Sequence, residues 1–194
     1  MTLFKKISGL LEGKTSDLYD WHDNWHEEFI VHLAKIVRPA VYVELGLYRC
    51  SLFNAMIPYA GTLYGVDINP ESGKFMKKSS KSTFYPMKTI EFAEKVRGKS
   101  ILIDLLFIDA DHSKKQVLED FHLFFPFVTP HGLILIHDTH PKNQEYLKSD
   151  CCHDCYQAIE ALSSRTSDYE LVTIPVHPGL TLIRKRTTQL SWQE

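Results

Sequence analysis

Short apolar runs alternate with amphipathic segments along most of the chain. Four of these runs stay apolar over about five residues, are rich in Val, Ile, Leu and Phe, and end in a polar residue or glycine. Such runs are typical of parallel strands that are buried on both faces. They occupy residues 40–46, 62–67, 103–111 and 132–138. A weaker fifth run, 83–88, contains Pro86, which is tolerated only near an edge or the end of a strand.

The segments between these runs are predicted to be helices that cross over the sheet. The helical candidates are residues 51–60, 91–97 and 113–125, and the last carries Val117, Phe121 and Phe124 at core-facing spacing. Ahead of the first strand, residues 16–37 repeat a large apolar side chain every three or four positions, which predicts an amphipathic helix that stops before Pro39.

The end of the chain has a different pattern. Residues 155–164 are predicted to be a helix, and two strands follow, 169–176 and 180–186, with only a turn between them. Two strands joined by a short turn form an antiparallel hairpin. The order of elements therefore predicts one α/β domain: a helix, five alternating β-α units, a helix and a closing hairpin.

Composition narrows the class of protein. The chain has 194 residues, 44% hydrophobic and 24% charged, with a net charge of −2, which suits one soluble domain and excludes a disordered chain. Because no basic excess exists, we expect no nucleic-acid partner. No run approaches the roughly 20 apolar residues that span a bilayer, and the N-terminus lacks a cleavable signal, so we expect a cytoplasmic protein without a membrane partner.

The four cysteines are predicted to be reduced thiols, because they are few and clustered. Three of them lie in CCHDC at 151–155, where Cys151, Cys152, His153 and Cys155 are too close together to surround one tetrahedral zinc ion. We interpret this segment as a loop that leads into a helix.

Acidic residues end nearly every predicted strand. In an open parallel sheet, ligands bind beyond the carboxyl ends of the strands, so these residues are candidates for a site. They are Glu44, Asp67, Asp109, Asp111 and Asp138.

The first strand end suggests an adenosine site. Glu44-Leu45-Gly46 is followed 23 residues later by Asp67, where a glycine would let the backbone approach a ligand and a carboxylate would accept from two ribose hydroxyls. The alternative is that Asp67-Ile68-Asn69-Pro70 is only a turn. A dinucleotide is disfavoured, because the loop has one glycine where G-x-G-x-x-G has three. A nucleoside without phosphates fits better.

Four stretches carry a family resemblance. They are, in chain order, VYVELGLYRCSLFNAM, GTLYGVDINP, IDLLFIDADHSKKQVLEDF and GLILIHDTHP. Together they resemble the S-adenosylmethionine-dependent methyltransferases of the Rossmann-like (class I) fold, and most of all the small metal-dependent O-methyltransferases of the macrocin and cephamycin-pathway type. The resemblance implies a three-layer α/β sandwich with a mostly parallel seven-stranded sheet and an antiparallel C-terminal hairpin. It also implies a single methyltransferase domain over 1–194, with 1–39 as an N-terminal helical lid or cap and 40–186 as the core.

The resemblance assigns a set of residues to S-adenosylmethionine. Glu44 and Gly46 would line the methionine end, Tyr48 and Ser51 would close the loop, and Asp67 would hold the ribose. The remaining residues of the cofactor set are Ile68, Thr89, which would meet the adenine, and Asp109. Related sequences usually have glycine where this chain has Cys50.

Many proteins of this type hold a divalent cation between the ends of the fourth and fifth strands. Asp109 and Asp138 match those two ligands, and Mg²⁺ is the cation that the family prefers. This chain departs from the pattern, because His137 and His140 flank Asp138 where relatives have Glu or Asn. Imidazole favours Zn, Fe or Ni over Mg. Either the metal differs, with His137 as a ligand, or the histidines act on protons.

His112 matches the position of a base in some relatives, and an imidazole can take a proton from a hydroxyl. The alternative is that His112 caps the following helix. We therefore expect an enzyme that transfers a methyl group from S-adenosylmethionine to a hydroxyl of a small molecule, with His112 and Asp138 as catalytic residues. A homo-oligomer is compatible with this activity. The alternative function is a module that binds S-adenosylmethionine without catalysis.

Overall fold

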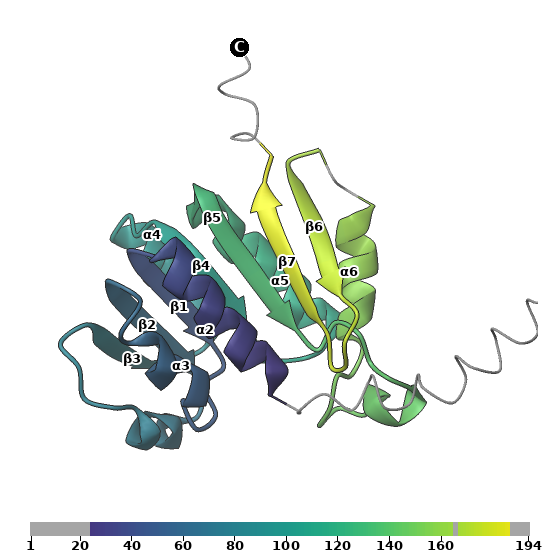
Figure 1. Ribbon diagram of the computed structural model, residues 1–194, viewed down its shortest axis with the longest axis horizontal. Coiled ribbons are helices and arrows are strands. Elements are labelled where there is room, and N and C mark those ends of the chain that lie inside the picture. The colour runs from purple at the N-terminus through teal and green to yellow at the C-terminus, as the bar shows by residue number, and fades with distance from the viewer. Residues whose placement is uncertain (1–23, 165–166, 187–194) are drawn as a thin grey trace, which may run out of the picture.

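The computed structural model describes residues 24–164 and 167–186, and within them a seven-stranded sheet forms the centre of the molecule (Figure 1). The strands are β1 Val41–Leu45, β2 Thr62–Asp67, β3 Ser82–Pro86, β4 Ile103–Ile108, β5 Val128–His137, β6 Tyr169–Ile174 and β7 Leu180–Lys185. Their spatial order is β3-β2-β1-β4-β5-β7-β6. The first five strands are parallel, and β7 is antiparallel to both β5 and β6. The predicted hairpin is confirmed.

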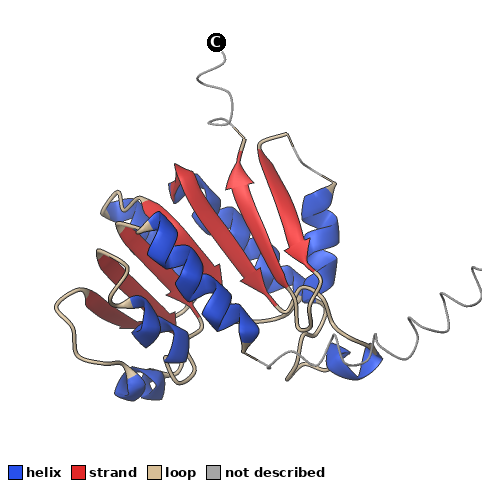
Figure 2. Ribbon diagram, viewed as in Figure 1, coloured by secondary structure: helices blue, strands red, loops and turns tan. Residues whose placement is uncertain are grey.

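Helices cover both faces of the sheet, which confirms the three-layer architecture (Figures 1 and 2). One face carries α2 (Trp25–Val37) and α3 (Ser51–Met56). The other face carries α4 (Thr89–Gly98), α5 (Lys114–Phe124) and α6 (Cys155–Ser163). Each layer has its own apolar core, because the central strands bury side chains on both faces. The continuously apolar runs of the sequence reflect this double burial.

Several element boundaries differ from the prediction. The helix predicted over 16–37 is described from Trp25 onward, and residues 16–23 lie outside the described residues. The crossover between β2 and β3 is the 3-10 helix η1 (Pro70–Phe75), so the second β-α unit is not α-helical. Asn69 caps this short turn by accepting from the Glu71 N–H. Two further 3-10 turns, η2 (Phe125–Phe127) and η3 (Gln144–Leu147), were not predicted.

Helix α2 is anchored beside the carboxyl ends of the strands. Ile30 and Ala34 are fully buried against the sheet, and the Trp25 Nε1–H donates to the carbonyl of His177 at 2.9 Å. His177 belongs to the turn between β6 and β7, so this bond joins α2 to the hairpin.

None of the helices within the described residues has both the length and the apolar character that a membrane span requires.

Gly46 allows the ends of β1 and β4 to come together. The backbone runs through a positive φ of 87° at Gly46, and the Asp109 N–H donates to the Leu45 carbonyl at 2.8 Å. A Cβ at Gly46 would lie only 2.1 Å from the backbone oxygen of Asp109. No side chain fits between these strand ends, so the position requires glycine on steric and conformational grounds.

We expect Gly46→Ala to lower the free energy of unfolding by at least about 2 kcal/mol, because the added methyl group meets backbone that cannot move aside. Urea unfolding followed by circular dichroism would measure this. Gly98→Ala is the matched control, since nothing lies within 4 Å of a Cβ at the end of α4. We expect that variant to be as stable as the natural chain or more stable by up to about 1 kcal/mol. Equal stabilities for the two variants would contradict the steric argument.

Candidate functional site

A cavity of about 910 Å³ opens at the carboxyl ends of the strands. Its size is near the upper end of the roughly 300–1,000 Å³ that small-molecule sites occupy. Apart from His140, every residue that the sequence assigned to a cofactor, a cation or catalysis lines this one cavity. These residues are Glu44, Gly46, Tyr48, Ser51, Asp67, Ile68, Thr89, Asp109, His112, His137 and Asp138. The parallel register brings them together from positions spread over the chain.

Asp67 organises one end of the cavity. Its Oδ2 accepts hydrogen bonds from the Leu47 and Tyr48 N–H groups at 3.0 and 3.1 Å and from the Ser72 hydroxyl at 2.9 Å. Its Oδ1 accepts from the Asn69 N–H at 2.8 Å. The predicted turn at Asp67 is therefore confirmed, and a role of this carboxylate toward a ribose stays a prediction. The same carboxylate that closes its own turn also holds the loop after β1 against the cavity.

Glu44 lies deeper in the same wall. Its carboxylate is buried in β1 and accepts a hydrogen bond of 2.5 Å from the Tyr42 hydroxyl. Burial, assisted by the nearby negative charges of Asp109 and Glu27, raises the pKa of Glu44 well above its ordinary value, although the Tyr42 bond opposes the shift. A cationic ligand group at this point would relieve the cost of keeping a charge buried.

The loop after β1 holds strained residues at the rim of the cavity. Cys50 has a φ of 56°, is fully buried, and donates from its Sγ to the Ser72 carbonyl at 3.3 Å. This left-handed conformation favours glycine, so a cysteine here is held in a strained backbone conformation. Tyr48 is 78% exposed and marks the outer rim. Ser51 donates to Glu27 of α2 at 2.7 Å, which ties the loop to that helix.

Thr89 forms the opposite wall, where α4 begins. The Gln116 side-chain amide donates to the Thr89 hydroxyl at 3.4 Å and to Asp120 Oδ1 at 3.1 Å. Asp120 is fully buried, and its Oδ2 has no hydrogen-bond partner among the described residues. Burial raises the pKa of Asp120 to about 6. Asp120 therefore supports the Thr89 wall of the cavity from behind, through the Gln116 amide.

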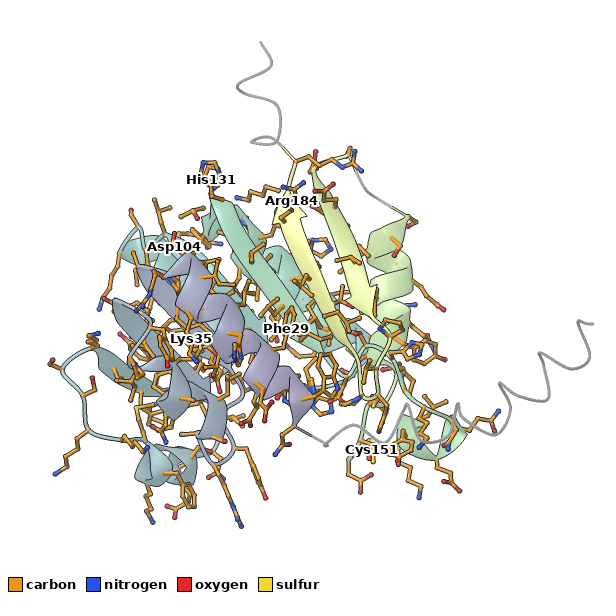
Figure 3. The ribbon with its side chains drawn as sticks, viewed as in Figure 1. Phe29, Lys35, Asp104, His131, Cys151 and Arg184 are labelled. Carbon is orange, nitrogen blue, oxygen red and sulfur yellow. The ribbon has the colours of Figure 1, made fainter. Side chains whose placement is uncertain are left out.

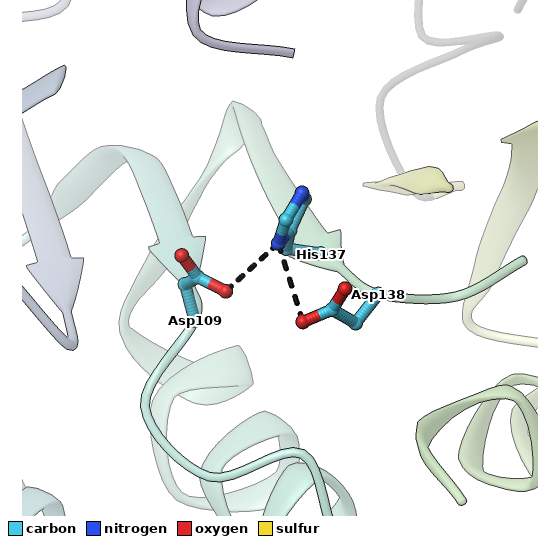
Figure 4. A group of neighbouring side chains, drawn as sticks. All are labelled: Asp109, His137 and Asp138. Carbon is cyan, nitrogen blue, oxygen red and sulfur yellow. Dashed lines mark hydrogen bonds and ion pairs between the residues drawn. The ribbon is translucent and has the colours of Figure 1, made fainter. Parts of the chain in front are cut away.

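The other end of the cavity contains two carboxylates joined by an imidazole (Figure 4). His137 Nδ1 lies 3.0 Å from Asp109 Oδ1 and 3.4 Å from Asp138 Oδ2. Burial alone would lower the pKa of His137, but the two carboxylates outweigh it and raise that pKa to about 10. The neighbouring histidines hold the pKa of Asp138 well below its ordinary value against its own burial. Asp138 has a φ of 59°, a turn that points the side chain back at the end of β4.

His112 contacts both carboxylates from the loop after β4. Its Nδ1 lies 2.5 Å from the Cys151 carbonyl and 3.0 Å from Asp138 Oδ2, and its Nε2 lies 3.7 Å from Asp109 Oδ1. Because a carbonyl only accepts, Nδ1 carries a proton. Burial opposes the charge on His112, yet Asp138 outweighs that effect and raises the pKa of His112 to about 9. The cap of α5 is Ser113, whose hydroxyl accepts from the Gln116 N–H, so the capping alternative for His112 was wrong.

The CCHDC segment packs directly behind this end of the cavity. Its cysteines are free thiols, as predicted, and Cys151 lies below the sheet near the strand ends (Figure 3). Cys152 Sγ donates to Asp138 Oδ1 at 3.3 Å, and Cys155 Sγ donates to the His137 carbonyl at 3.2 Å. With the Cys151 carbonyl on His112, the segment contacts three site residues. This role could not be predicted from the sequence, because spacing alone does not show what a loop packs against.

His26 is the functional candidate that strand-end reasoning missed. It comes from α2, is only 7% exposed, and lines the cavity. Its ring centroid lies 3.9 Å from that of His137, with the planes tilted by 41°. Burial and the neighbouring His137 lower the pKa of His26 to about 4. Its place beside Trp25 on an amphipathic helix was the only signal available in the sequence.

Two other histidines lie outside the site. His140 is exposed, does not line the cavity, and donates its backbone N–H to the Pro178 carbonyl at 2.8 Å. Of the alternatives left open for His140, its position favours a loop histidine over a proton-transfer role beside Asp138, because the chain turns away after Asp138. His131 lies at the opposite end of β5 (Figure 3).

The donor set at the second end fits a divalent cation. Asp109, His137 and Asp138 each offer one ligand atom, and these atoms all lie within 4.8 Å of one another. His137 Nε2 is buried without a hydrogen-bond partner among the described residues, so only its Nδ1 is engaged. Two carboxylates and one imidazole form a mixed oxygen and nitrogen site.

Comparison with known proteins shows the family of the chain. A family described as a methyltransferase domain matches residues 43–139, which is half of the sequence. The chain belongs to this methyltransferase family. The matched segment contains the carboxyl ends of β1, β2, β4 and β5, which line the cavity of this methyltransferase. A comparison with curated proteins gives no match.

Solved structures resemble the methyltransferase over most of its length. An O-methyltransferase from Bacillus cereus in complex with SAH has 12% identity and a TM-score of 0.71, covering 93% of this chain and 91% of that one. An SAH-bound methyltransferase from Podospora anserina has 14% identity and a TM-score of 0.67, with 92% and 85% covered. An O-methyltransferase of tomaymycin synthesis from Streptomyces achromogenes, in complex with SAM, has 15% identity and a TM-score of 0.63, with 82% and 79% covered. These likenesses establish a shared fold.

Asp120 makes the stability of the protein depend on pH in a defined direction. Its pKa is about 6 in the folded state against an ordinary 3.8, so the folded state binds the proton more tightly and stability is lost as pH rises from 4 through 6. Asp120→Asn cannot titrate. We therefore expect its free energy of unfolding, relative to the natural chain, to increase over that window by up to roughly 3 kcal/mol.

Urea unfolding at pH 4, 5, 6 and 7 would measure this difference. Glu94→Gln, at an exposed position on α4, is the control and should give the same difference at every pH. A pH-independent difference for Asp120→Asn would contradict the assignment.

Proposed function

We propose that this methyltransferase transfers the methyl group of S-adenosylmethionine to a hydroxyl of a small molecule. The observation that carries the proposal is that one cavity is lined by Asp67, Ile68 and Thr89 at one end and by a carboxylate and imidazole cluster at the other. Names of the structurally similar proteins support oxygen as the acceptor atom, since two of them are O-methyltransferases.

The donor would occupy the end near Asp67 and Glu44. Asp67 Oδ1 accepts one backbone N–H, which leaves it able to accept from a ribose hydroxyl as well. Thr89 and the exposed Ile68 line the adenine side, and the buried Glu44 would meet the ammonium group of the methionine part. Gly46 keeps the wall between these two points free of a side chain.

The acceptor would lie against Asp109, His112, His137 and Asp138. Asp109, His137 and Asp138 would hold a divalent cation, which would supply Lewis acidity that lowers the pKa of an acceptor hydroxyl. His112 is the proposed base in the cation-bound site, where a cation on Asp109 and Asp138 would take the place of its second proton: the Cys151 carbonyl and Asp138 hold the Nδ1 proton, so the neutral Nε2 is the nitrogen that would take the hydroxyl proton. The oxygen to carbon bond forms as the sulfur to carbon bond breaks, and S-adenosylhomocysteine leaves.

Binding of the donor is tested by titration calorimetry with S-adenosylhomocysteine. We expect binding to the natural chain and an affinity at least about 10-fold lower for Asp67→Ala, because a charged acceptor of hydrogen bonds is removed and the loop after β1 loses its anchor. Glu94→Gln is the control and should bind as the natural chain does. Absence of binding to the natural chain at millimolar S-adenosylhomocysteine would refute the proposal.

Transfer is tested with methyl-labelled S-adenosylmethionine against a panel of catechols, phenols and hydroxylated sugars. We expect Asp138→Asn to lose at least about 100-fold of the transfer rate, because both the proposed base and the proposed cation depend on that carboxylate. Its affinity for S-adenosylhomocysteine should stay unchanged. Unchanged turnover would remove Asp138 from catalysis, and binding without transfer to any acceptor would favour the module that binds the cofactor without catalysis.

A further inference from the structure

We propose that Asp109, His137 and Asp138 bind a first-row transition-metal ion in preference to Mg²⁺, and that the ring of His26 on α2 holds His137 in the orientation that this site requires. The inference deepens the proposed function and rests on it only in placing a cation at the acceptor end. It assigns α2, which lies outside the segment that matches the methyltransferase family, to the cation site.

The donor atoms indicate the kind of metal. His137 Nδ1 faces both carboxylates, so an imidazole nitrogen stands between the two oxygen donors (Figure 4). Mg²⁺ prefers oxygen ligands and water, whereas imidazole suits Zn²⁺, Co²⁺, Ni²⁺ and Fe²⁺. A site whose central donor is an imidazole therefore discriminates against Mg²⁺.

Side chains of the 151–155 segment orient the proposed metal ligands Asp138 and His137. The Cys152 thiol donates to Asp138 Oδ1, so Oδ2 is the oxygen that faces both His137 Nδ1 and His112 Nδ1. The Cys155 thiol donates to the His137 carbonyl, which fixes the backbone at the end of β5. Contacts that orient metal ligands in this way commonly set the affinity of a metal site.

The ring of His137 has a different kind of support. Metal-bound histidines usually donate their second ring N–H to a fixed partner, yet Nε2 of His137 is buried without a hydrogen-bond partner among the described residues. The ring is held by packing instead. His26 lies over it at 3.9 Å between centroids, and Phe107 meets it at 6.1 Å. Removal of the His26 ring would free the His137 ring to turn away from the carboxylates.

Helix α2 is fixed firmly enough to give this support. Trp25 bonds the β6–β7 turn, Glu27 accepts from Ser51, and both residues flank His26 in the sequence. Ile30, one turn further along, is fully buried. His26 is therefore held on both sides, and its own Nδ1 is buried without a hydrogen-bond partner among the described residues.

The first experiment measures metal preference on chelator-treated full-length protein by calorimetry with Co²⁺ and with Mg²⁺. We expect Co²⁺ to bind roughly 100-fold more tightly or better, with a visible absorption spectrum of nitrogen and oxygen ligands. His137→Asn is the decisive variant, because it converts the set to oxygen donors: the ratio of Mg²⁺ to Co²⁺ dissociation constants should fall at least about 10-fold. An unchanged ratio would overturn the assigned ligand, and so would a near-ultraviolet band of a cobalt–thiolate bond.

The second experiment tests His26 with two variants of different shape. His26→Ala removes the ring, and we expect the Co²⁺ affinity to fall about 10- to 100-fold. His26→Phe keeps a ring without nitrogen and should bind Co²⁺ within about 3-fold of the natural chain, with the same absorption spectrum. His32→Ala is the control, since His32 is exposed on the same helix and, within residues 24–164 and 167–186, bonds only the Glu28 carbonyl of that helix. Equal losses in the Ala and Phe variants, or no loss in either, would overturn the packing role.

Titration of each variant with S-adenosylhomocysteine separates this inference from the proposed function. Retained binding shows that the variant is folded and that the donor end is intact, so a lost or unchanged metal preference then bears on the inference alone. Failure of the natural chain to bind S-adenosylhomocysteine would instead overturn the proposed function. The metal measurements would still test the metal preference on their own.

Discussion

Electrostatic repulsion between two carboxylates at neighbouring strand ends constrains which groups can surround them in the cavity. Asp109 and Asp138 come together because β4 and β5 are parallel and adjacent, and their charges would repel one another without positive charge between them. His137 and His112 supply that charge as protonated imidazoles, at distances of 3.0 Å to Asp109 and Asp138 respectively. A divalent cation would meet the same electrostatic demand. Proton and cation therefore compete for one position in the fold.

Segments from both ends of the chain surround this pair of carboxylates. Helix α2 approaches from one face and presents His26, whereas the 151–155 segment approaches from the other side and presents thiols and a carbonyl. The hydrogen bond from Trp25 to the β6–β7 turn joins α2 to the hairpin, and its two residues are 152 positions apart in the sequence. The acceptor end is thus assembled from parts that the central sheet alone does not provide. The donor end, in contrast, is built almost entirely from the loops after β1 and β2.

Much of the fold and of the donor end could be predicted from the sequence. The apolar runs correspond to β1, β2, β4 and β5 because a strand buried on both faces has no polar alternation, and the hairpin follows from two runs with only a turn between them. The crossover after β2 could not be predicted well, since its 3-10 turn depends on how η1 packs against Phe84 through Gly73. The position of His140 could not be predicted for a similar reason: its neighbour Asp138 lies in a turn whose direction is set by the contact with Pro178.

Local pattern and the order of elements fix which carboxylates reach the edge of the sheet, because strand ends and parallel connections follow from them. What those carboxylates contact depends on tertiary packing. The packing of His26 on His137 and the three contacts of the CCHDC segment join residues far apart in the chain, and no local periodicity encodes such pairs. Sequence reasoning therefore found the ligand candidates, and the folded chain showed what orients them.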